Sequence, residues 1–183
     1  RPLVGGLSTS PISSDQETRI SGLSLGGRDN RVPGSFSAAI VANLPGSIDG
    51  VLDPTDVFKS FGYSVDLPNR ELQVFDTSTY RLRLNNVPPD GAVVRWVGND
   101  RPFVRLGDGR LALIDTGSSF GLALNEVTGA NHRRGNTIHD LGGGTVQSRK
   151  VAPHTVSIGA LVLNNVPTDV LTGVAPGTPV IIG

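Results

Sequence analysis

The stretch Leu-Ala-Leu-Ile-Asp-Thr-Gly-Ser-Ser, residues 111–119, joins an apolar run to a short polar loop that carries one carboxylate. Four consecutive apolar residues can be buried on both faces of a sheet, so residues 110–114 are predicted to form a strand. Gly117 permits backbone conformations closed to other residues, and Thr116 and Ser118 offer short hydroxyls near the carboxylate. The stretch therefore predicts that Asp115 is held in a fixed position facing a cleft.

Asp-Thr-Gly is also ordinary turn chemistry. Asp and Thr side chains hydrogen-bond to nearby backbone groups, and Gly supplies a positive φ. On this reading Asp115 is a turn residue in an unrelated β-sandwich. The rest of the chain has to decide between the two readings.

The composition indicates a turn-rich all-β protein. The 24 Gly and 13 Pro of this 183-residue chain are scattered between short apolar runs, and 37% hydrophobic residues can build a core. The length fits one sizeable domain or two small lobes. One short helix is predicted at residues 54–61 and a second after Asn125. The predicted strands are residues 19–25, 35–42, 63–67, 71–75, 80–84, 92–97, 103–106, 110–114, 120–124, 145–151, 155–163 and 180–182.

Charge and residue usage narrow the class of partner. Sixteen basic and sixteen acidic residues cancel, which argues against a nucleic acid or a membrane surface and favours a peptide or small molecule. There is no cysteine and hence no disulfide or thiolate metal site. His132, His139 and His154 lack metal-ligand spacing, so we expect neither a metal nor another cofactor. Trp96 is expected to lie in a core or at a lobe junction.

The sequence also predicts an internal repeat. Residues 3–7 and then 20–27 parallel residues 141–145 and then 158–165, with equal spacing between the paired blocks. After the second block of each half, the chain reaches an apolar pair beside a Gly. We expect two related units end to end, although Gly-rich hairpins also resemble one another without being repeats.

These features together resemble the retropepsin-like aspartic proteases of bacteria and retroviruses. The resemblance covers residues 102–183 and rests on residues 114–119, the Gly-rich segment 141–145, Asn165-Val166-Pro167 and the final Ile181-Ile182-Gly183. Residues 48–72 look like the closing part of an earlier unit, with Asp53 where the family usually has Gly. The resemblance implies an acid-protease fold of two β-barrel lobes.

On this resemblance, residues 1–80 are the back portion of a first lobe, residues 81–98 connect the lobes, and residues 99–183 are the front portion of a second. The chain would then be an internal or processed piece of a two-lobed, pepsin-like molecule. Its partners would be a peptide or protein substrate, with flanking fragments of the same precursor or a second copy. A secreted or periplasmic location is expected from the family.

The resemblance also assigns roles to residues. Asp115 would be one of two carboxylates that activate a water for peptide hydrolysis, supported by Thr116, Gly117 and Ser118. The second carboxylate would come from a missing segment or from Asp115 of another copy, because Asp76-Thr77-Ser78 lacks the Gly and is interpreted as a turn. The segment Leu141-Gly142-Gly143-Gly144 would be a flap over bound peptide. The alternative is a protease-like binding or scaffold module without a complete catalytic pair.

Overall fold

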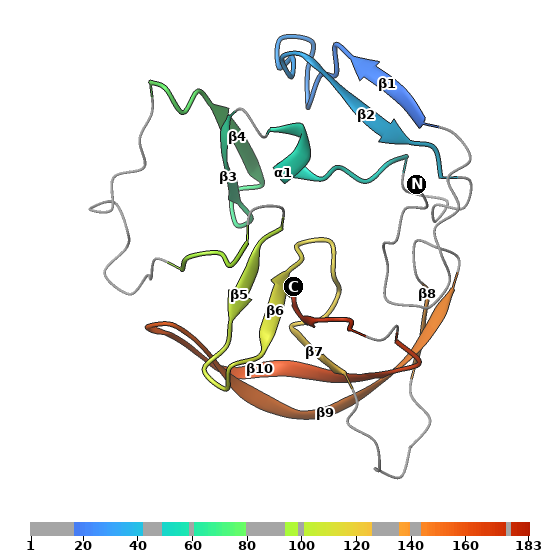
Figure 1. Cartoon of the computed structure of the whole chain (residues 1–183), viewed down its shortest axis with the longest axis vertical. Helices are drawn as coiled ribbons and strands as arrows, with labels where there is room; N and C mark the ends of the chain where they lie inside the picture. Colours follow the sequence, from blue (N-terminus) through green and yellow to red (C-terminus); the bar gives the residue numbers. More distant parts are fainter. Residues whose placement is uncertain are drawn as a thin grey trace. The chain divides into compact units, whose positions relative to one another are not determined.

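A computed structural model describes residues 17–41, 49–58, 61–79, 94–98, 101–125, 136–139, 144–174 and 177–183 (Figure 1). The chain divides into two compact units, one made largely of residues 10–80 and the other largely of residues 81–183. Strands dominate both units, and the described residues contain one helix of four residues. The all-β prediction is therefore confirmed.

The second unit is built on one seven-stranded sheet. Its strands are β5 (Phe103–Arg105), β6 (Leu111–Ile114), β7 (Leu122–Asn125), β8 (Asn136–His139), β9 (Thr145–Ile158), β10 (Leu161–Thr172) and β11 (Val180–Ile182). The order across the sheet is β5-β6-β11-β7-β10-β9-β8. Most neighbours are antiparallel, but β11 runs parallel to β6, and β10 runs parallel to β7. Figure 1 shows β9 and β10 as one long, curved hairpin.

The apolar run of β11 explains its central position in the sheet. Val180 and Ile181 are 6% and 3% exposed, although successive side chains of a strand point to opposite faces. Val180 belongs to a core cluster with Val104 and Ala112, whereas Ile181 packs in a second cluster with Phe120 and others. A strand covered on both faces needs a continuous apolar sequence rather than an alternating one.

The first unit contains two hairpins and the helix. Strand β1 (Glu17–Ser21) pairs with β2 (Ser35–Ala39), and β3 (Gly62–Asp66) pairs with β4 (Glu71–Phe75), both antiparallel. Helix α1 (Pro54–Val57) begins as predicted, because the Asp53 side chain accepts a 2.9 Å hydrogen bond from the Thr55 N–H and Pro54 occupies the first turn. The residue after the helix, Phe58, caps its C-terminal end, is 1% exposed and packs its ring against Tyr63.

Several expectations about individual elements are corrected. Helix α1 stops at Val57, short of the predicted residue 61. The strand predicted at residues 155–163 is broken by a turn at residues 159–160 that joins β9 to β10. Trp96 is half exposed, so it is not a core residue. The second helix, expected after Asn125, and the strand expected at residues 80–84 lie outside the described residues.

Two larger expectations also differ from the structure. The sheets of the described segments are open, with two, seven and two strands, and none closes into the predicted barrel. In the part of the suggested repeat that the structure describes, residues 20–27 and 158–165 pair differently: Ile20 lies opposite Phe36 across β1 and β2, whereas Ile158 lies opposite Leu161 at a tight hairpin. Across the described ranges, the structure shows no helix long and apolar enough to cross a membrane.

Candidate functional site

Asp115 lies where two parallel strands end together. Ile114 is opposite Ile182 in the pairing of β6 with β11, so Asp115 is the first residue beyond the paired ends. Its backbone N–H donates a 2.7 Å hydrogen bond to the carbonyl oxygen of Ile182. The ladder between β6 and β11 thus continues one step past the strands and fixes the backbone of Asp115.

The loop after Asp115 is a tight turn that also holds the carboxylate. The Ser118 N–H donates to the Asp115 carbonyl at 3.0 Å, and the Gly117 N–H donates to Asp115 Oδ1 at 3.0 Å. Asp115 is half-buried, whereas Thr116 and Gly117 are exposed. The carboxylate therefore has one oxygen held by its own turn.

The hydroxyl groups of the loop do not bond to the carboxylate. Ser118 Oγ accepts a 3.2 Å hydrogen bond from the Phe120 N–H, which steadies the far end of the loop. The expectation that Thr116 and Ser118 hold Asp115 through their hydroxyls is replaced by a backbone contact from Gly117. A backbone donor requires only that residue 117 adopt the turn conformation.

Two glycines outside the triplet allow neighbouring chain segments to approach this loop. A Cβ at Gly183 would lie 3.0 Å from the Ser118 Cβ and would overlap the carbonyl oxygen of Phe120. A Cβ at Gly121 would lie 2.8 Å from the carbonyl oxygen of Pro167 in β10. Real Cβ atoms are almost never this close to other heavy atoms, so both positions need glycine. The sequence drew attention to Gly183 through its apolar pair, but gave no sign of Gly121.

The local hydrogen bond does not by itself distinguish Asp115 from other aspartates. Asp53, Asp76 and Asp108 each accept a hydrogen bond from the N–H two residues ahead, at 2.8–3.0 Å. All three are exposed residues of turns or a helix cap. Asp115 differs because it is half-buried and its backbone is tied to a central strand of the sheet. The interpretation of Asp76 as a turn residue is confirmed.

Three aspartates, Asp66, Asp76 and Asp108, have a lowered pKa with a local cause. The side chain of Arg110, and then its backbone N–H, lower the pKa of Asp108. The pKa values of Asp76 and Asp66 are lowered by hydrogen bonds from Ser78 and Asn69. These carboxylates stay charged because donors face them, which is the usual behaviour of capped turns.

Only some of the remaining predicted site residues are among those that the structure describes. Leu141, Gly142 and Gly143 of the expected flap lie outside the described residues, and Gly144 directly precedes β9. His132 also lies outside them, while His139 ends β8 and His154 contacts the Ala152 carbonyl oxygen at 2.9 Å. In the described segments no three His, Asp or Glu side chains gather in a way that could hold a metal ion.

Sequence reasoning missed a buried polar pair in the second unit. Ser148 of β9 donates a 2.5 Å hydrogen bond to Asp169 Oδ1 of β10, and these residues are 2% and 9% exposed. Nothing in the local sequence marks the pair, because the two residues meet only when β9 and β10 are in register. It ties two strands of the sheet that also carries Asp115.

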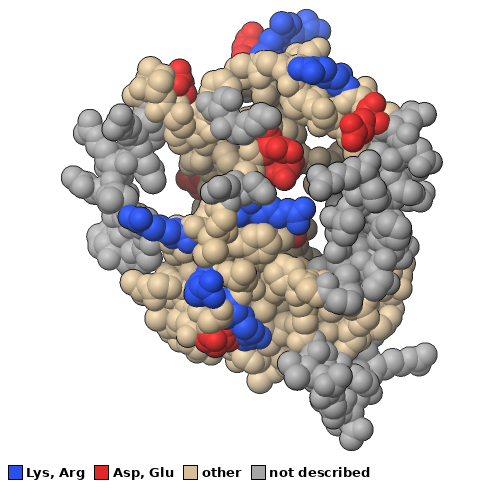
Figure 2. All heavy atoms as spheres, in the orientation of Figure 1, with Lys and Arg blue, Asp and Glu red and all other residues tan. Residues whose placement is uncertain are grey.

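Charged side chains of both signs are interspersed on the face shown in Figure 2. The one ion pair found among the described residues joins Arg110 to Asp108 at 2.6 Å. Comparison of the chain with protein families, with curated proteins and with solved structures gives no match.

Proposed function

We propose that this chain is part of an aspartic endopeptidase in which Asp115 is one of two catalytic carboxylates. The observation that carries the proposal is the half-buried carboxylate at the common end of β6 and β11, with its backbone bonded to Ile182 at 2.7 Å. A catalytic group must be held by the rigid part of a fold, because misplacement costs rate steeply. The exposed aspartates in the other turns lack this support.

In this reaction two close carboxylates share one proton and hold a water between them. The ionised carboxylate accepts a proton from the water as the water oxygen attacks the peptide carbonyl carbon. The protonated carboxylate donates a hydrogen bond to the carbonyl oxygen, where negative charge develops. Because two close like charges are costly, the pair works in the singly protonated state, so activity is expected at acidic pH.

We propose that the second catalytic carboxylate is not one of the described residues of the same copy. It is supplied by a segment outside this chain or by Asp115 of a second copy. The substrate is an extended peptide, and the segment at residues 141–144 is proposed to cover it.

The second candidate is a binding or scaffold module without catalysis. It is favoured by the hydrogen bond from Gly117 to Asp115, which has the same form as the bonds made by Asp53, Asp76 and Asp108. If this candidate is right, the carboxylate serves only to close its turn.

Binding of a statine-type peptide separates the two candidates. Such a peptide carries a hydroxyl where the tetrahedral intermediate of hydrolysis has one, so a working carboxylate pair binds it more tightly than the parent peptide. Calorimetry should be done with the chain and with the complete encoded polypeptide at acidic pH. Preference for the statine peptide that is lost in Asp115→Asn supports the endopeptidase, while equal affinity for both peptides supports the module.

A further inference from the structure

The outer edge of β4 in the first unit is open. In the described part of the chain β4 pairs with β3 alone, so one side of its backbone has no partner strand. An unpaired edge offers N–H and C=O groups to another strand, and proteins usually protect such edges by charge, proline or a covering segment. The sequence of β4, Glu-Leu-Gln-Val-Phe, contains no proline and carries one charge.

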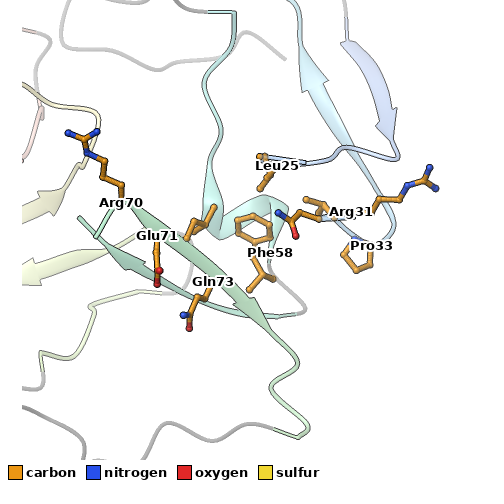
Figure 3. Close-up of a pocket in the computed structure, with 12 residues that line it drawn as sticks. Leu25, Arg31, Pro33, Phe58, Arg70, Glu71 and Gln73 are labelled. Atoms are coloured by element: carbon orange, nitrogen blue, oxygen red, sulfur yellow. The ribbon is translucent and has the colours of Figure 1, made fainter. Parts of the chain in front are cut away.

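A cavity of about 620 Å³ lies beside β4 (Figure 3). Glu71, Leu72, Gln73 and Val74 all line it. Successive side chains of a strand point to opposite faces, so Leu72 and Val74 share one face of β4 and Glu71 and Gln73 share the other. In Figure 3 Glu71 and Gln73 are directed away from Phe58, which lies on the other side of β4.

One face of the β3–β4 hairpin is apolar and exposed. Tyr63 lies opposite Val74, and Val65 lies opposite Leu72, so the four side chains share a face. Val65, Leu72 and Val74 are 46%, 42% and 38% exposed. The cavity over this face is also lined by the apolar residues Leu25, Val32, Pro33 and Phe58. Together the open edge and the apolar face fit a strand whose side chains alternate like those of β4.

We infer that the occupant is β4 of a second copy of this chain, paired antiparallel about Gln73. In this register Gln73 meets its own equivalent, and Leu72 of each copy lies opposite Val74 of the other. One step beyond the strand ends, Arg70 of each copy lies opposite Asp76 of the other. Apolar pairs on one face and two opposite-charge pairs at the ends make the edge self-complementary, as a two-fold interface requires.

The charges at the ends of β4 are available for this contact. The Asp76 carboxylate is exposed and accepts hydrogen bonds from Ser78 that lower its pKa, so it is charged at neutral pH. Arg70 makes no ion pair with any residue of the described ranges. The proposed contact between copies involves neither Asp115 nor peptide hydrolysis, so it can be tested without measuring activity.

Single-cysteine cross-linking tests the register directly, because the chain has no cysteine of its own. Opposed residues of an antiparallel pair have Cα atoms about 4.5–5.5 Å apart, which a disulfide can span. Under mild oxidation Gln73→Cys should form a covalent dimer as the main product. The matched control is Leu67→Cys, since Leu67 is 67% exposed in the turn of the same hairpin. Cross-linking of Gln73→Cys no greater than that of the control overturns the inference.

A charge exchange provides a second test that needs no cysteine. Arg70→Asp places two like-charge pairs across the interface and should raise the dimer dissociation constant about tenfold. Asp is suitable there because Arg70 has a φ of 57°, which Asp tolerates better than most residues. Adding Asp76→Arg should restore dimerisation measured by sedimentation. If sedimentation gives the wild-type protein the mass of a single chain, the proposed pairing is wrong. It is also wrong if the double variant folds but does not recover dimerisation.

Discussion

The Asp115 N–H and the Ile182 carbonyl oxygen are 2.7 Å apart, joined across the ends of two parallel strands. Residues 115 and 182 are far apart in the sequence, so this contact exists only once β11 has inserted between β6 and β7. The next residue, Gly183, then lies against the loop that follows Asp115. The position of the carboxylate thus depends on the C-terminal strand of the sheet.

Gly183→Ala should disturb the Asp115 loop. The added methyl would overlap the Phe120 carbonyl oxygen and press on Ser118, so β11 or the loop must shift. We expect a loss of unfolding free energy of about 1–3 kcal/mol, typical of overpacking, measured by denaturant titration. Gly50→Ala is the control, because a Cβ there meets no atom within 4 Å. Equal stability of the two variants would contradict the close packing of Gly183.

Ser148→Ala should destabilise the second unit. The change removes the 2.5 Å hydrogen bond to Asp169 and leaves a largely buried carboxylate oxygen without its donor. The expected cost is about 1–3 kcal/mol, measured by thermal or denaturant unfolding. Ser157→Ala is a suitable control, since Ser157 is a partly buried serine of the same strand that lies outside this pair. A cost within error of zero for Ser148→Ala would show that Asp169 does not need this donor.

Arg110→Ala should raise the pKa of Asp108 toward its ordinary value of 3.8. In the native protein the lowered pKa adds stability that is present above pH 3.8 and lost as the pH falls through the folded pKa. The stability difference between variant and wild type should therefore shrink in acid. Carbon-13 NMR titration of the carboxyl carbons checks the shift, and Asp66, held by Asn69, should keep its titration. An unchanged Asp108 would mean that Arg110 has no effect on it.

The sequence correctly predicted those elements that are marked by a pattern within a few neighbouring residues. Residues 71–75 and 180–182 form strands with the predicted bounds, and the hairpin at residues 106–110 forms around Gly109 at a φ of 89°. The N-terminal start of α1 followed from Asp53 and Pro54. In each case alternation, an apolar run, a cap or a turn residue was enough.

Features that depend on pairing between strands distant in the sequence were not predicted. Residues 136–139, Asn-Thr-Ile-His, are too short a segment for a clear local strand pattern, and they form β8 by pairing with β9. Because apolar residues lie on both sides of the turn at 159–160, the sequence predicted a single strand where the structure has the end of β9 and the start of β10. The triplet after Ile114 predicted the turn that holds Asp115, but not Gly121, whose approach to Pro167 depends on a parallel pairing of β7 with β10.

The most direct test of the proposed function compares peptide cleavage by Asp115→Asn and Asp108→Asn at acidic pH, in this chain and in the complete encoded polypeptide. Asn can accept the same backbone hydrogen bond in either turn, so both variants should fold. We predict that Asp115→Asn lowers turnover by about 10²–10⁴-fold while Asp108→Asn leaves it unchanged. Turnover by Asp115→Asn equal to that of Asp108→Asn would contradict a catalytic role for Asp115.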